Sequence, residues 1–211
     1  MTSELTAPTE GEKRKNAVGL TVRDLAQAAV FAALIAALGL PGTITIGSSG
    51  VPITLQTLGV MLAGAILGWR KGALAVLIFA ALAICGLPIL AGGRTGLVSL
   101  TSPTAGFFIG WLPAVIVIGL GTALMMPKYR VIPGFVINVF GGLGVIYLFG
   151  TIGLMIRADM TWWAALSTNG IYVTGDLVKA AATALVARQV HRGYPGLIPP
   201  LRLNGLRLKR R

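Results

Sequence analysis

The chain has 211 residues, of which 55% are hydrophobic and only 11% are charged, and its formal net charge is +12. Soluble domains carry about a quarter charged residues, so the composition excludes an ordinary soluble domain and predicts an integral membrane protein. The 29 glycines fit such a protein, because small residues let membrane helices approach closely. The single cysteine, Cys85, excludes an internal disulfide.

In chain order, a polar segment precedes six apolar runs. Residues 1–20 are mostly polar and charged and predict a disordered cytoplasmic tail. They are not a signal peptide, because a short apolar segment and a cleavage site do not follow the basic residues. The runs, separated by polar residues, Pro or Gly, are approximately 25–40, 55–68, 73–90, 105–126, 134–156 and 170–190. A membrane-spanning helix needs about 20 residues, so the second run is short unless 51–54 extend it. We predict an all-α bundle of six transmembrane helices within 21–192, and a basic cytoplasmic tail over 193–211.

The distribution of basic residues supports an even number of spans. With both termini in the cytoplasm, 15 of the 18 Lys and Arg residues fall in inner segments, and the outer loops hold only Arg94 and Arg157. The remaining basic residue, Lys179, lies inside the sixth run. An odd number of spans would destroy this positive-inside bias. Orientation, and attraction of the C-terminal tail to anionic lipid, explain the net charge without a nucleic-acid partner.

Two ionisable residues, Asp176 and Lys179, interrupt the sixth run in the segment YVTGDLVKAA. Charged groups at such depth are costly and usually face the interior of a bundle and a partner. Their i, i+3 spacing places them on one helical face. We favour a pair that offers an acceptor and a donor to a polar ligand. A structural ion pair between helices, and a proton relay through Asp176, remain open.

One arginine of the outer loops, Arg94 in AGGRTG, runs against the charge bias. The glycines beside it allow the loop to fold back over a cavity. A guanidinium group binds a carboxylate through two parallel hydrogen bonds. We therefore predict that Arg94 binds an acidic ligand, with an ordinary solvated loop charge as the alternative.

Further candidate site residues lie near the predicted outer ends of other runs. Thr54 and Gln56 lie in VPITLQTLG, where helix capping accounts for one hydroxyl group but not for Gln56. Tyr147 falls in the outer half of the fifth run and is a candidate pocket residue. Tyr172 is interpreted as an aromatic residue at the membrane interface rather than a site residue.

Alanines recur at every fourth position of the first run, in two neighbouring ladders. One ladder contains Ala28 and Ala32, and the other contains Ala29 and Ala33. Small residues at this spacing form a smooth stripe that suits a close helix contact. That contact is either within the bundle or with another protein, and the spacing alone leaves both open.

Several enzymatic motifs are absent from the sequence. There is no GxxxxGK[ST] loop for ATP hydrolysis, and no GxSxG or HExxH motif of a hydrolase. One histidine and one cysteine are too few for a metal cluster. We predict that the chain is not an enzyme and uses no cofactor.

Four segments of the chain are similar to a known family in their order and spacing. The sequence resembles the BioY family, the biotin-binding components of energy-coupling factor (ECF) vitamin transporters, in VPITLQTLGVMLAGAILGWRKGALAVLIF, GLPILAGGRTG, SPTAGFFIG and GDLVKA. The resemblance covers 20–192. Leu90, Phe107 and Thr174 depart mildly from the residues common in the family, which affects the packing of the pocket more than the class of ligand.

The resemblance implies a function and partners. Such a component is a six-helix subunit of a prokaryotic cell membrane, with cytoplasmic termini, which binds biotin with high affinity near the outer face. It implies a transmembrane coupling subunit and two ATPases as partners, with Ala29 and Ala33, and the neighbouring Ala28 and Ala32, as candidates for the contact with the coupling subunit. A carrier of biotin or another small vitamin that works without ATP, and a membrane scaffold without a ligand, remain the alternatives.

Biotin suits the candidate residues chemically. Its ureido ring offers two N–H donors and a carbonyl acceptor, its thiophane ring is apolar, and its tail ends in a carboxylate. Asp176 can accept from a ureido N–H, and Lys179 can donate to the ureido carbonyl or to the acid. Arg94 is the candidate partner of the tail carboxylate near the mouth of the pocket.

The predicted topology is testable with reporter fusions. Fusions after Lys71 and after Arg130 should report a cytoplasmic location, and fusions near Arg94 and Arg157 an external one, because basic loops are retained inside. A reporter that is active on only one side of the membrane distinguishes these locations. A cytoplasmic signal from the fusion near Arg94 would contradict the predicted topology.

Overall fold

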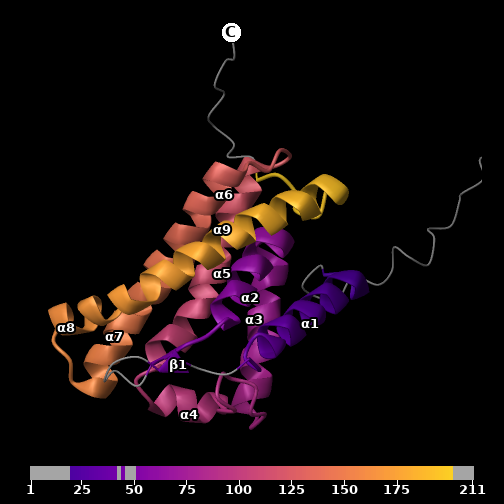
Figure 1. The fold of residues 1–211 in the computed structure, drawn as a ribbon. Helices are drawn as coiled ribbons and strands as arrows, with labels where there is room; N and C mark the ends of the chain where they lie inside the picture. The colour runs from indigo at the N-terminus through magenta and orange to yellow at the C-terminus, as the bar shows by residue number, and fades with distance from the viewer. Residues whose placement is uncertain (1–19, 42–43, 46–50, 202–211) are drawn as a thin grey trace, which may run out of the picture.

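The computed structural model describes residues 20–41, 44–45 and 51–201. The predicted tails over 1–20 and 193–211 therefore lie mostly outside the described residues. Within them the chain is helical, apart from one short pair of antiparallel strands (Figure 1). The elements, in which η denotes a more widely wound π-helical stretch, are α1 Val22–Ala37, β1 Ile44–Thr45, β2 Pro52–Ile53, α2 Gln56–Leu62, η2 Ala63–Leu67, α3 Gly68–Ile84, α4 Gly96–Thr101, α5 Ala105–Met125, α6 Val131–Asn138, η3 Val139–Val145, α7 Ile146–Ala158, α8 Trp162–Thr168 and α9 Gly170–Gly193.

Helix α1 begins at a reciprocal cap that its sequence supplies. The hydroxyl of Thr21 accepts from the N–H of Asp24 at 3.2 Å, and the Asp24 carboxylate accepts from the N–H of Thr21 at 3.0 Å. Two backbone donors that would otherwise lack partners at the helix start are thereby satisfied. The cap fixes where α1 starts.

The second and third apolar runs form a hairpin of helices. Gly68, at the junction of η2 and α3, has a φ of +79°, which glycine adopts without steric cost. A Cβ atom on Gly72 would lie 2.9 Å from the carbonyl oxygen of Ala63. In one straight helix these two residues would be about 13 Å apart along the axis. The chain therefore reverses direction at Gly68.

Four helical segments of the described residues are long and apolar enough to cross a membrane: Gln56–Ile84, Ala105–Met125, Val131–Ala158 and Gly170–Gly193. The first of these contains the reversal at Gly68, and α1 is a shorter helix of 16 residues. The prediction of a helical membrane protein is confirmed. The count of six spans stays a prediction.

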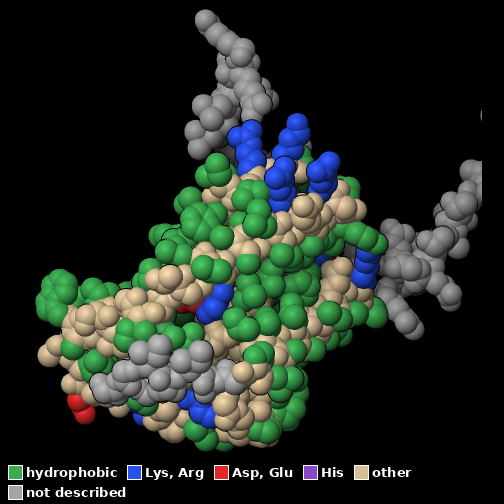
Figure 2. Space-filling model, viewed as in Figure 1, with side chains coloured by type: hydrophobic (Ala, Val, Ile, Leu, Met, Phe, Trp, Pro, Cys, Tyr) green, Lys and Arg blue, Asp and Glu red, His purple; other side chains and the backbone are tan. Residues whose placement is uncertain are grey.

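One end of the bundle is held together by polar contacts between segments that are distant in the sequence. Lys71 Nζ, at the start of α3, lies 3.4 Å from Asp24 Oδ1 of α1 and donates to the carbonyl of Leu197 at 3.3 Å. The N–H of Leu201 donates to the carbonyl of Ala123, near the end of α5, at 3.0 Å. Figure 2 shows Lys and Arg side chains gathered where α9 ends, whereas α4, α8 and the strand pair lie toward the opposite end (Figure 1). The bundle thus has a basic end and an end built of loops and short helices.

The two alanine ladders of α1 have different surroundings. Ala28 and Ala32 are buried in the core, with 0% and 4% of their surface exposed, whereas Ala29 and Ala33 are exposed. The expectation that all four contribute to a partner interface is therefore corrected, because the chain itself covers Ala28 and Ala32. Only the ladder with Ala29 and Ala33 is open to another protein.

Helices α5 and α7 approach each other through glycines. A Cβ atom on Gly106 would collide with the carbonyl oxygen of Phe149 and would lie 2.8 Å from the Cα of Gly153. Both are backbone atoms, which cannot rotate away as a side chain would. By contrast, a Cβ atom on Gly144, in the exposed part of η3, would have only the ring of Phe140 nearby, at 4.0 Å.

This contrast predicts different outcomes for the same substitution. Gly106→Ala should lower the free energy of unfolding by at least about 3 kcal/mol, the upper end of the usual cost of overpacking, because it must move a helix backbone. Gly144→Ala should be neutral or slightly stabilising, since alanine is the better helix former. Thermal unfolding of the purified variants in detergent measures both, and equal melting temperatures would contradict the close packing of α5 and α7.

Candidate functional site

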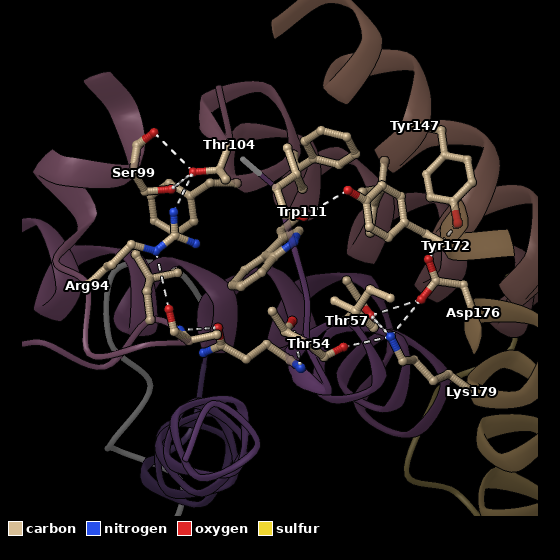
Figure 3. Close-up of a pocket in the computed structure, with 18 residues that line it drawn as sticks. Thr54, Thr57, Arg94, Ser99, Thr104, Trp111, Tyr147, Tyr172, Asp176 and Lys179 are labelled. Atoms are coloured by element: carbon tan, nitrogen blue, oxygen red, sulfur yellow. Dashed lines mark hydrogen bonds and ion pairs between the residues drawn. The ribbon is translucent and has the colours of Figure 1, made fainter. Parts of the chain in front are cut away.

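A cavity with α4 among its walls lies toward the loop end of the bundle (Figure 1). Figure 3 shows the residues that line it. Its walls come from 51–57, the loop 90–94, α4, the first turns of α5, α7 and the first half of α9. The volume that the centre of a water molecule can occupy between these walls is about 70 Å³. All six predicted site residues line this cavity, namely Thr54, Gln56, Arg94, Tyr147, Asp176 and Lys179.

A buried ion pair forms one end of the cavity. Lys179 Nζ lies 2.7 Å from Asp176 Oδ1, and the two residues are 8% and 5% exposed. The ammonium group also donates to the carbonyl of Thr54 at 2.6 Å and to the hydroxyl of Thr57 at 3.1 Å. An ammonium group has three donors, so each donor of Lys179 has an acceptor within the protein.

The Asp176 carboxylate has donors on both of its oxygens. Besides Lys179, the hydroxyl of Tyr147 donates to Oδ2 at 2.7 Å, and the hydroxyl of Thr57 lies 3.4 Å from Oδ1. A carboxylate has about four acceptor positions, and the bond from Tyr147 is the one that reaches Oδ2. The oxygen Oδ2 can therefore accept one more hydrogen bond from a donor in the cavity.

Arg94 lies at the other end of the cavity, in a turn closed by backbone hydrogen bonds between Leu90 and Arg94. Its Nε donates to the carbonyl of Ala91 at 3.2 Å, and its Nη1 to the hydroxyl of Thr104 at 3.4 Å. No carboxylate of the described residues forms an ion pair with it. Burial lowers the pKa of the Arg94 guanidinium, because desolvation disfavours its charge, yet arginine stays protonated. This end therefore presents an uncompensated positive charge that favours an anion.

An aromatic wall separates the two polar ends. Figure 3 shows the Trp111 indole between Arg94 on one side and the Asp176–Lys179 pair on the other. Trp111 is 5% exposed, and its ring centre lies 5.5 Å from that of Phe108 and 5.7 Å from that of Phe79. These contacts hold the indole in place. The cavity therefore suits an elongated ligand with an apolar middle, an anionic end and a second polar end.

Thr54 and Gln56 reach the cavity, but their polar groups are largely engaged by the protein. The Thr54 hydroxyl accepts from the N–H of Gln56 at 3.3 Å, although the N-cap of α2 is Leu55, and the Thr54 carbonyl accepts from Lys179. Both side-chain N–H bonds of Gln56 go to backbone carbonyls, those of Ile35 and Ile89. Gln56 thus supports the walls of the cavity that it lines, and its direct contact with a ligand stays a prediction.

Some residues of the cavity do not stand out in the sequence. The prediction that Tyr172 lies at the membrane interface is wrong, because it is 6% exposed, lines the cavity and donates its hydroxyl to the carbonyl of Val51 at 2.8 Å. Thr57 does have a signal, since it lies in VPITLQTLG together with Thr54 and Gln56. Trp111 has a weaker one, since it lies a turn and a half inside α5 rather than at its end.

Comparisons with known proteins agree with this geometry. Residues 11–196 match the model of the BioY family. The chain is 42% identical over 185 residues to the biotin transporter BioY of Rhizobium etli, and the alignment covers 85% of this chain and 98% of that protein. It is 43% identical over 189 residues to the biotin transporter BioY of Rhodobacter capsulatus, with 83% and 97% covered. The crystal structure of an S-component for biotin from an ECF-type ABC transporter is similar with a TM-score of 0.78 and 31% identity, covering 88% of this chain and 95% of that one.

Proposed function

Because the chain belongs to the BioY family, we propose that it is the biotin-binding membrane subunit, or S component, of a biotin uptake system in a prokaryotic cell membrane. It is not an enzyme, and we propose no cofactor. The observation that carries the proposal is the cavity with an unpaired arginine at one end, a carboxylate with a free acceptor position at the other, and an indole between them. Biotin has groups that match each of these three parts.

The match follows from the hydrogen-bonding capacity of each group. A ureido N–H of biotin donates to Asp176 Oδ2, where Tyr147 leaves an acceptor position. One donor of Lys179 moves from the Thr57 hydroxyl to the ureido carbonyl. The bond to Thr57 is the one given up because, at 3.1 Å, it is longer than the bond to the Thr54 carbonyl at 2.6 Å. The thiophane ring lies against Trp111. The tail carboxylate pairs with Arg94, whose N–H groups are only partly used by the protein.

We propose six spans with both termini, including the tails 1–20 and 193–211, in the cytoplasm. The spans are α1, α2 with η2, α3, α5, the continuous stretch from α6 to α7, and α9. Two features support this arrangement: the reversal at Gly68, and the basic residues gathered at one end of the bundle. The biotin site then lies toward the outer face.

We propose that a separate transmembrane coupling subunit and two ATPases energise uptake. The exposed ladder of Ala29 and Ala33 on α1 is the proposed contact with the coupling subunit. Small side chains let two helices approach closely and slide, whereas large side chains interlock. This face is distinct from the cavity, since neither alanine is among its lining residues.

Substitutions at the two ends of the cavity test the proposed ligand. Asp176→Asn removes the charge but keeps the shape, and should weaken biotin binding at least about tenfold. Arg94→Ala should weaken biotin more than biotin amide, because only the acid has a carboxylate. Arg157→Ala, at an exposed arginine outside the cavity, is the control and should change neither affinity. Calorimetric titration of the three folded variants and the wild type with both ligands measures these affinities, and equal losses of affinity for biotin and biotin amide in Arg94→Ala would contradict its role.

A bulky residue in the alanine ladder tests the proposed partner. Ala33→Trp should abolish co-purification with the coupling subunit and ATP-driven uptake, while biotin binding by the isolated chain persists. Leu185→Trp introduces the same side chain at an exposed position of α9 and should leave co-purification unchanged. If Ala33→Trp loses both expression and biotin binding while Leu185→Trp keeps them, the ladder packs inside the bundle and the proposed contact is wrong. Normal uptake in cells without a coupling module would favour a carrier that works alone.

A further inference from the structure

The amide of Gln56 connects two parts of the outer end that are distant in the sequence. Its Nε2 donates to the carbonyl of Ile35 in the last turns of α1 at 3.2 Å and to the carbonyl of Ile89 at 3.0 Å. Its Oε1 accepts from the backbone N–H of Ala91 at 2.9 Å. The residue is 1% exposed, so these bonds are shielded from water.

The second of these parts is the turn that carries Arg94. Within this turn the N–H of Leu90 donates to the carbonyl of Arg94 at 3.0 Å, and the N–H of Arg94 to the carbonyl of Leu90 at 3.2 Å. Arg94 Nε then bonds the carbonyl of Ala91, the residue whose N–H is held by Gln56. The position of the guanidinium group therefore depends on a chain of hydrogen bonds that begins at the amide of Gln56.

Only a primary amide fits these partners. Two carbonyl oxygens need two donors, and one N–H needs an acceptor, which is what the Gln side chain supplies. A carboxylate would place further acceptors against the carbonyls of Ile35 and Ile89. Space for the amide depends on Gly39, since a Cβ atom there would lie 2.8 Å from Gln56 Nε2.

We propose that Gln56 is a positioning residue of the site. Its amide fastens the turn 90–94 to α1 and so holds the Arg94 guanidinium where it meets the ligand carboxylate, without itself contacting the ligand. The identity of that ligand rests on the proposed function, whereas the fastening of the turn does not. Loss of the amide should thus loosen the turn and speed biotin release, chiefly through Arg94.

Hydrogen–deuterium exchange of the turn in the ligand-free protein tests the fastening directly. In Gln56→Glu, the introduced carboxyl faces the carbonyls of Ile35 and Ile89. At a pH where it is ionised, the carboxylate repels both carbonyls, so the turn should exchange about tenfold faster than in the wild type. At a pH where it is protonated, the acid donates to one carbonyl and accepts from Ala91, so the ratio of exchange rates should fall back toward one.

The ratio to the wild type is taken at each pH, so that titration common to both proteins cancels. The ionisable groups that line the cavity are the same in both: Arg94, Tyr147, Tyr172, Asp176 and Lys179. Gln189→Glu makes the same chemical change at an exposed position of α9 and should leave the turn unaffected at every pH.

Two further variants keep the test decisive if Gln56→Glu fails to fold. Gln56→Met fills a similar volume without a comparable donor or acceptor, so faster exchange should persist at all pH values. Gly39→Ala should displace the amide from outside the cavity and loosen the same turn. An exchange ratio near one for either folded variant would overturn the proposal.

Biotin dissociation rates separate positioning from direct contact. Gln56→Met should speed dissociation about tenfold in the wild-type background but add little once Arg94→Ala is present, because the effect acts through Arg94. Equal effects in both backgrounds, with unchanged exchange of the turn, would instead indicate that Gln56 touches the ligand and would refute the proposal. If the wild type does not bind biotin, the proposed function fails while the exchange experiment still decides the role of Gln56.

Discussion

Asp176 and Lys179 lie together inside a bundle that exposes many large apolar side chains, and their charges must be satisfied by the chain itself. Removing two such ions from water costs several kcal/mol each, which their mutual attraction offsets only when further hydrogen bonds are made. Those bonds come from Thr54 and Thr57 at the start of α2 and from Tyr147 of α7. The pair thus requires α2, α7 and α9 to meet at one place, which is where the cavity lies.

The molecule is also divided into two ends with different polar groups. The cavity and its hydrogen bonds lie toward the loop end, where Gln56 and Arg94 organise a turn over an otherwise apolar wall. The basic residues lie at the other end, where Lys71 joins α1 to the segment after α9. Between the two ends, close contacts such as that of Gly106 with Gly153 keep the helices together. The proposed binding site and the basic residues that we expect to orient the chain in the membrane therefore lie in different parts of one bundle.

The most conspicuous features of the sequence mark residues that line one cavity of the structure. Asp176 and Lys179 are identified because charged residues are rare inside apolar runs. Arg94 is identified because it is a basic residue in a predicted outer loop, against the charge bias. Features that depend on rotation about a helix axis were not predictable. Adjacent ladders such as Ala28 and Ala29 have the same spacing, and only packing decides which of them is buried.

Other features have no signature in the sequence because their partners are backbone groups. Gln56 bonds three of them, in segments that are 21 to 35 residues away. An aromatic residue near the end of an apolar run, such as Tyr172, looks the same whether it faces lipid or the interior. These positions are fixed by tertiary contacts, which composition and periodicity do not reveal.

Thermal unfolding of the purified wild-type protein with and without biotin tests the central claim most directly. A ligand that binds only the folded state stabilises it by about 2.7 kcal/mol at a hundredfold excess over Kd. The account predicts a melting temperature that rises with biotin concentration. An unchanged melting temperature of well-folded protein at millimolar biotin would show that the cavity between Arg94 and Asp176 is not a biotin site.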